Sequence, residues 1–81
     1  MRHLGRYAEA AEAAYAAIEG EPLRESAHAV LIEVLLAEGD VAQARRQLSR
    51  YADLLWTELA VRPSAALVGQ VAAARPIPVG P

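Results

Sequence analysis

Helix-breaking residues recur along this chain at intervals of about one helix length, and they constrain the fold more than any other feature. Glycine and proline interrupt the chain at Gly5, Gly20–Pro22, Gly39, Pro63 and Pro76. The stretches between them are rich in alanine and leucine, which favour helices. Apolar residues recur there three and four positions apart, the spacing of one helical face. The sequence therefore predicts an all-α fold of about four helices.

Residues that cap helices mark the ends of the four expected segments. Asp40 and Ser64 each precede a segment, and their side chains can accept hydrogen bonds from a helix N-terminus. Gln43, three residues after Asp40, completes the pattern of a capping box. Gly20 is expected just past the end of the first segment, with Pro22 blocking continuation. The expected helices run from about Arg6 to Glu19, Leu23 to Glu38, Val41 to Leu59 and Ala65 to Ala74.

One apolar stripe on each expected helix makes the predicted core. The second helix carries Ile32 and Leu36 off its stripe, so it is expected at the centre, buried on more than one side. The third helix should bury Leu48 and Tyr51 against it. The expected partners of Leu48 and Tyr51 on the second helix are Leu31, Val34 and Leu35. In chain order, the four stripes are Tyr7, Ala11, Ala14 and Ile18; Leu23, Ala27, Val30, Leu31, Val34 and Leu35; Val41, Ala44, Leu48, Tyr51, Ala52, Leu55 and Leu59; and Leu67, Val68 and Val71.

Length and charge limit the classes of function. The 81 residues allow one small domain, expected at 1–75, and a proline-rich tail at 76–81. The 8 basic residues are all arginine and the 10 acidic ones leave a net charge of −2, so sequence-specific binding of nucleic acid by this chain alone is not expected. No cysteine is present to form a disulfide or a thiol nucleophile. Without a signal peptide or an apolar span, the chain is expected in the cytoplasm and not in a membrane.

No catalytic, cofactor or metal site is predicted. His3 and His28 are the only histidines and fall on different segments. Ser26, His28 and Asp40 could be assembled into a triad on paper, but nothing in the sequence fixes that geometry. We expect His28 to pack at the start of the second helix instead.

Gly5 and Gly39 are 34 residues apart, and a similar sequence of about five residues follows each glycine. This period is typical of tetratricopeptide helix pairs. Ile32 departs from the pattern because it stands where paired helices cross and a small residue is usual. Trp56 stands where a second closing proline belongs, so the third helix should run on for about one more turn. The sequence predicts tetratricopeptide-like antiparallel helical hairpins, with the leading helix of the first pair missing.

Two longer sequence strings resemble the bacterial transcriptional activator domain of SARP-type regulators. The first runs from Leu4 to Ala10 and continues with Pro22-Leu23-Arg24-Glu25 and His28; the second is Glu58-Leu59-Ala60-Val61-Arg62-Pro63-Ser64. The family favours glycine at the position of Ala60, so a left-handed backbone there would cost this chain about 1 kcal/mol or more. The resemblance covers residues 4–74 and corresponds to the C-terminal portion of the family's domain.

This resemblance implies a function through protein contacts. In the family, the domain helps a regulator to dimerise and to engage promoter DNA and RNA polymerase, next to a winged-helix DNA-binding domain. The expected function is therefore an activator and interaction domain, with RNA polymerase or a DNA-binding domain encoded upstream as its partner. The alternative is a tetratricopeptide-like scaffold that binds a peptide or protein outside transcription. A pull-down that recovers RNA polymerase subunits would favour the first.

Two surfaces are candidates for partner binding on the third helix. Arg45, Arg46 and Arg50 could contact phosphates or an acidic protein, or they form a solvated face in which Asp53 pairs with Arg50. Trp56 and Leu54 lie off the apolar stripe, so either the fourth helix covers them or they form an exposed patch.

The first helix is the candidate dimer face. In a tetratricopeptide stack each helix packs between two neighbours, and this one follows no partner. Tyr15, Ala10, Ala13 and Ala17 are expected to lie uncovered, and alanine allows close approach of a second helix. A symmetric homodimer would present this patch twice.

Overall fold

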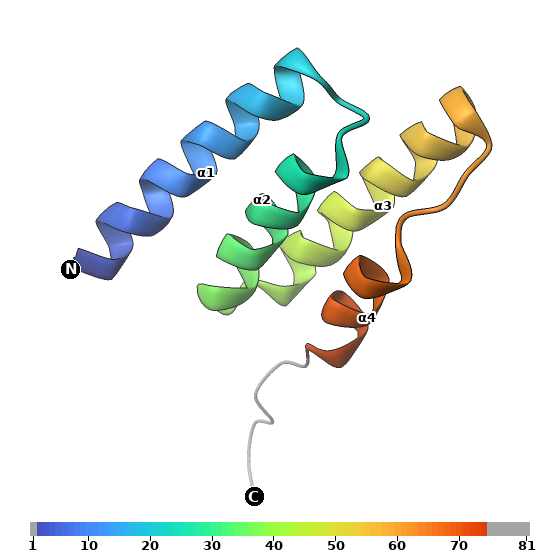
Figure 1. The fold of residues 1–81 in the computed structure, drawn as a ribbon. Helices are drawn as coiled ribbons and strands as arrows, with labels where there is room; N and C mark the ends of the chain where they lie inside the picture. The colour runs from blue at the N-terminus through green and yellow to red at the C-terminus, as the bar shows by residue number, and fades with distance from the viewer. Residues whose placement is uncertain (1, 75–81) are drawn as a thin grey trace, which may run out of the picture.

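Four helices make up the protein in the computed structural model, which describes residues 2–74 of the chain and side chains from residue 6 onward. They are α1 (Arg2–Gly20), α2 (Glu25–Ala37), α3 (Val41–Leu59) and α4 (Ala65–Ala73). Each helix runs antiparallel to the one before it, as Figure 1 shows. Residues 2–74 contain no strand, so the expected all-α fold of antiparallel hairpins is confirmed. The predicted tail at 76–81 lies outside the described residues.

The helices form a flat stack with α2 at its centre. The stack measures 44 × 30 × 16 Å, so it is much thinner than it is long or wide. Helix α2 contacts all three other helices, whereas among the described helices α1 contacts α2 and neither α3 nor α4 (Figure 1). The apolar stripe of α1 therefore packs on α2 alone among the described helices and does not reach the third helix.

Two opposite faces of α2 are buried, as the sequence predicts. Ile32 is 0 % exposed and belongs to the main core with residues of α3 and α4. Leu31 and Val34 are also buried, but they lie roughly 100–160° around the helix from Ile32, on the side where α1 packs. The main core consists of Ile32, Ala44, Tyr51, Leu55, Leu67 and Val71, with Leu23, Ala29, Leu35, Leu36 and Leu48 packed against it.

Because α2 is buried on two faces, only part of the expected packing between the second and third helices is found. Tyr51 is buried and Leu48 is half-buried in the main core, as expected, and Leu35 packs against the same cluster. Leu31 and Val34 are not in that cluster, because the period of α2 turns them toward α1. Three further stripe residues, Val30, Leu59 and Val68, are exposed rather than buried.

Helix α3 begins and ends as the sequence predicts. Asp40 Oδ1 accepts a hydrogen bond from the Gln43 backbone N–H at 3.1 Å. In a full capping box the Gln43 side chain would also accept a hydrogen bond from the Asp40 backbone N–H. Here Gln43 Oε1 accepts from Arg46 Nε at 2.8 Å instead. Ser64 caps α4 in the same way, with its Oγ accepting from the Leu67 N–H at 3.2 Å.

Helix α1 is longer than the sequence predicts at both ends. It begins at Arg2, so Gly5 lies inside it, and Gly20 is its last residue rather than a left-handed residue beyond the end. A glycine inside a helix costs about 1 kcal/mol relative to alanine but does not break it. Proline removes a donor and clashes with the preceding turn, and it is Pro22 that prevents α1 from continuing.

Ala60 ends α3 in the left-handed region, with φ 55° and ψ 36°. Its N–H donates to the Trp56 carbonyl at 3.0 Å. Alanine is sterically strained in this region and glycine is not. The structure therefore places Ala60 in the unfavourable backbone conformation indicated by the family's preference for glycine.

Ala60→Gly should therefore stabilise the protein by about 1 kcal/mol, which corresponds to a rise in Tm of about 4–8 °C for a domain of this size. Thermal unfolding followed by circular dichroism measures the change. Ala16→Gly, at an exposed position inside α1, is the matched control and should lower stability by about 1 kcal/mol. Equal destabilisation by both variants would contradict the strain at Ala60.

Candidate interaction site

A buried histidine joins the start of α2 to the middle of α3. His28 is 3 % exposed, and its ring stacks on Tyr51 with centroids 4.2 Å apart. Its Nε2 lies 2.8 Å from the Pro22 carbonyl oxygen, which can only accept, so Nε2 carries the proton. Nδ1 then accepts from Gln47 Nε2 at 3.1 Å. Both ring nitrogens thus have a partner, which confirms that His28 packs at the start of the second helix.

Glu25 joins α2 to α4. Its carboxylate accepts hydrogen bonds from the Ser64 backbone N–H at 2.9 Å and from the Ser64 hydroxyl. These two hydrogen bonds hold the pKa of Glu25 below its ordinary value of 4.5. Burial raises the pKa of Tyr51 above its ordinary value of 10.0, and the nearby charge of Glu25 adds to this effect. Ser64 is thus held at the start of α4 by a residue 39 positions earlier.

The lowered pKa makes this contact sensitive to acid. A carboxyl whose pKa is lower in the folded state stabilises the fold fully above its unfolded pKa, near 4.5, and less as the pH falls through the folded pKa. Glu25→Gln should lower stability at neutral pH, and its difference from the unchanged chain should shrink below about pH 4.5. Urea unfolding midpoints between neutral pH and about pH 2 measure this. Glu33→Gln, at an exposed position of the same helix, is the control; a similar pH profile for both variants would contradict the prediction.

Every buried side-chain nitrogen and oxygen among the described residues has a hydrogen-bond partner. No three acidic or histidine side chains within the described part of the chain lie close enough to hold a metal ion. Ser26, His28 and Asp40 do not form a triad, because both ring nitrogens of His28 are already bound to Pro22 and Gln47.

The two sequence strings that carry the family resemblance meet in space. Glu25 and His28 belong to the first string and Ser64 to the second, and the Glu25–Ser64 contact joins them. A model of the bacterial transcriptional activator domain matches residues 1–73 of the chain. The chain belongs to this family. No curated protein and no solved structure matches the chain. No helix of this activator domain, over the residues described, is long and apolar enough to cross a membrane.

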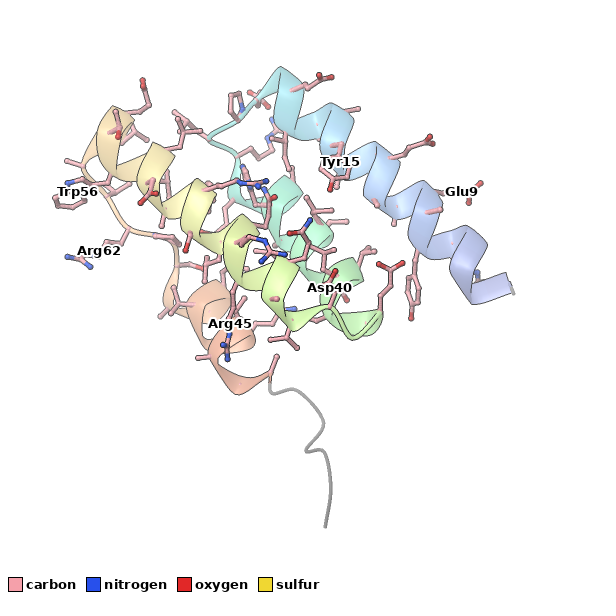
Figure 2. The ribbon with its side chains drawn as sticks, turned by 180° about the vertical axis from the view of Figure 1, so that it is seen from behind. Glu9, Tyr15, Asp40, Arg45, Trp56 and Arg62 are labelled. Atoms are coloured by element: carbon pink, nitrogen blue, oxygen red, sulfur yellow. The ribbon has the colours of Figure 1, made fainter. Side chains whose placement is uncertain are left out.

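The structure divides the arginine cluster of the activator domain. Arg45, Arg46 and Arg50 are all exposed on α3. Arg46 and Arg50, four residues apart, share a face, whereas Arg45 lies about 140° around the helix from Arg50. Figure 2 shows Arg45 in the first half of α3. Within residues 6–74 no ion pair joins Arg50 to Asp53; the ion pair present there is between Arg24 and Glu21.

The structure also divides the candidate dimer face of α1. Ala10, Ala13 and Ala17 line a shallow groove between α1 and α2, together with Ala27 and Val30 of α2. Tyr15 is exposed, but it lies about 160° around the helix from both Ala13 and Ala17. The three alanines therefore share one surface, which we call the α1–α2 groove, and Tyr15 lies on the other side.

Of the two alternatives for Trp56, the structure shows the exposed one, because the fourth helix does not cover it. The indole is 57 % exposed, while Leu54 is half-buried. Helix α4 has nine residues and turns Leu67 and Val71 toward the main core, away from Trp56. Arg62 lies over the indole instead, 5.5 Å from the ring centroid (Figure 2).

Sequence reasoning missed Gln47 and the Glu25–Ser64 contact. Gln47 is buried and lies within the apolar stripe of α3, between Ala44 and Tyr51. A polar residue at such a position signals a buried hydrogen bond. The Glu25–Ser64 contact left no such signal, because it joins residues 39 positions apart that are both adjacent to loops.

Proposed function

We propose that this activator domain works through protein contacts, as an interaction and dimerisation module of a transcription regulator. The observation that carries this proposal is the open α1–α2 groove. Family membership supports a role connected with transcription activation. The hydrogen bonds of His28 and Glu25 hold the helices together.

The position of α4 indicates what the α1–α2 groove is suited to bind. Helix α4 packs against both α3 and α2, as successive helices do in a stack of hairpins. The equivalent position against α2 and α1 is not filled by any described helix, because α1 contacts α2 alone. Small side chains line this position, and Val30 remains 41 % exposed there. A helix that packs there would cover Val30 and the alanines of α1 that line the groove.

A second copy of the chain is our proposed occupant of the groove. Two copies related by a twofold axis would each place α1 against the groove of the other, so the same surface is used twice. The alanines allow close helix approach, which compensates for the modest apolar area that each contributes. Tyr15 is then outside the interface.

Sedimentation equilibrium from micromolar to millimolar concentration tests this homodimer. We expect the unchanged chain to shift from its 8.6 kDa monomer toward twice that mass. Ala13→Glu should keep the chain monomeric, because it places a charge in the apolar interface. Tyr15→Glu, a substitution on the opposite side of α1, should leave the association unchanged. A single 8.6 kDa species at every concentration would rule the homodimer out.

The exposed arginines are the proposed contacts with a regulatory partner. Arg46 and Arg50 on one face of α3 suit an acidic surface of RNA polymerase or of a DNA-binding domain, the partners that the family suggests. Binding to purified RNA polymerase, compared between the unchanged chain and Arg46→Glu/Arg50→Glu, tests this. Loss of binding in the variant supports the contact. Absence of binding by the unchanged chain favours the alternative of a scaffold that acts outside transcription.

A further inference from the structure

An open apolar groove lies beside Trp56, on the opposite end of the stack from α1. It runs between α3 and the start of α4 and has a volume of about 710 Å³; its lining includes Leu48, Ala52, Trp56, Val61, Arg62 and Val68. We call it the Trp56 groove. Trp56 is 57 % and Val68 42 % exposed, and Val61 is exposed as well. Half of the six large apolar side chains exposed among the described residues therefore gather in this one groove.

We propose that the proline-rich segment 75–81 of the same chain binds in the Trp56 groove. This segment reads Arg75-Pro76-Ile77-Pro78-Val79-Gly80-Pro81. Each residue from Pro76 to Val79 has a ring or a branched apolar side chain, and the prolines fix φ before binding. Proline-rich segments bind aromatic grooves because this fixed backbone loses little entropy on binding.

The reach of the segment is sufficient. Helix α4 carries the chain from Ala65, which lines the groove, to Ala74, nine residues on. At 1.5 Å per residue this separates the groove from the end of the helix by about 14 Å. Seven residues in an extended proline-type conformation span about 22 Å at roughly 3.1 Å each. A return along α4 past Val68 therefore reaches the groove at Ala65 with about 8 Å of the segment to spare.

The chemistry of the groove matches that of the segment. Proline residues have carbonyl acceptors and no N–H donor, and the groove offers the indole N–H of Trp56 and the hydroxyl of Ser49 as donors. The connection is short, so the local concentration of the segment near the groove is in the millimolar range. A contact too weak to hold a separate peptide is then strong enough to hold the tethered one.

The single tryptophan of the chain makes this contact measurable. We expect Trp56 emission in the full chain to lie at shorter wavelength, and its quenching by acrylamide to be weaker, than in the variant Pro76→Ser/Ile77→Ser/Pro78→Ser. The helical circular dichroism should be unchanged, since these substitutions lie beyond α4. Equal emission and quenching in both chains would overturn the proposal.

Two further variants locate the contact. Val68→Ser, in the groove, should shift the emission to longer wavelength as the tail variant does. Val30→Ser, with nearly the same exposed fraction but in the α1–α2 groove, should leave it unchanged. The emission shift should be independent of protein concentration. A shift that appears only at high concentration would place the segment on a second copy and overturn binding within one chain.

Discussion

Ile32→Ala should lower the free energy of unfolding by about 2–5 kcal/mol. Ile32 is 0 % exposed, at the point where α2 meets α3 and α4 in the main core. Removing its branched side chain loses buried apolar area and leaves a cavity, because close-packed helices relax only in part. At roughly 0.05–0.15 kcal/mol per residue, the 81 residues support a total stability of about 4–12 kcal/mol. This single substitution could therefore remove half of the stability.

Urea unfolding at equilibrium measures the effect, with graded controls on the same helix. Ile32→Val removes one methylene and should cost about 0.5–1.5 kcal/mol. Val30→Ala, at a position 41 % exposed, should cost clearly less than Ile32→Ala. If Ile32→Ala and Val30→Ala cost the same, Ile32 is not at the centre of the core.

His28→Phe should destabilise the protein by about 2–5 kcal/mol, through lost hydrogen bonds rather than lost packing. Phenylalanine can keep the ring stacked on Tyr51, but it leaves the Pro22 carbonyl and the Gln47 amide without their partner. The Gln47 amide is buried and the Pro22 carbonyl partly so, and a group of this kind left unpaired costs about 1–3 kcal/mol. The unfolding midpoint in urea reports the total.

A double variant separates the two causes. His28→Phe/Gln47→Leu replaces both sides of one hydrogen bond by apolar groups, which is far less costly than removing one side. We expect it to recover part of the stability that His28→Phe loses. If the double variant is less stable than His28→Phe, the loss comes from packing around Tyr51 and the role assigned to the hydrogen bonds is wrong.

Local signals were reliable where they act within one or two turns of the chain. The bounds of α3 were predicted correctly because Asp40 supplies an acceptor at its start and Ala60 ends it before a proline. The strain at Ala60 followed from a comparison of one residue with the family string. The prediction that the first helix begins after Gly5 was wrong, because a glycine without a nearby proline weakens a helix but does not end it.

Side-chain partners across the fold were predicted less well. The sequence indicates that α2 is buried on more than one side, but not that Leu31 and Val34 face α1 while Ile32 faces α3 and α4. The sequence left open whether the fourth helix covers Trp56, and the structure leaves the indole exposed. The arginines singled out for binding divide between two faces of α3, and Tyr15 lies on the other side of α1 from the alanines singled out with it, because residues close in sequence need not share a face.

The sequence by itself determined the number of helices, most of their ends, the family and the central position of α2. These properties depend on the periodicity of apolar residues and on turn residues, which act over a few positions. Only the tertiary structure decided that Glu25 holds Ser64, that Gln47 binds His28, and which apolar surfaces stay open. Those outcomes depend on the angle and height at which helices distant in sequence pack, and many side chains set these together.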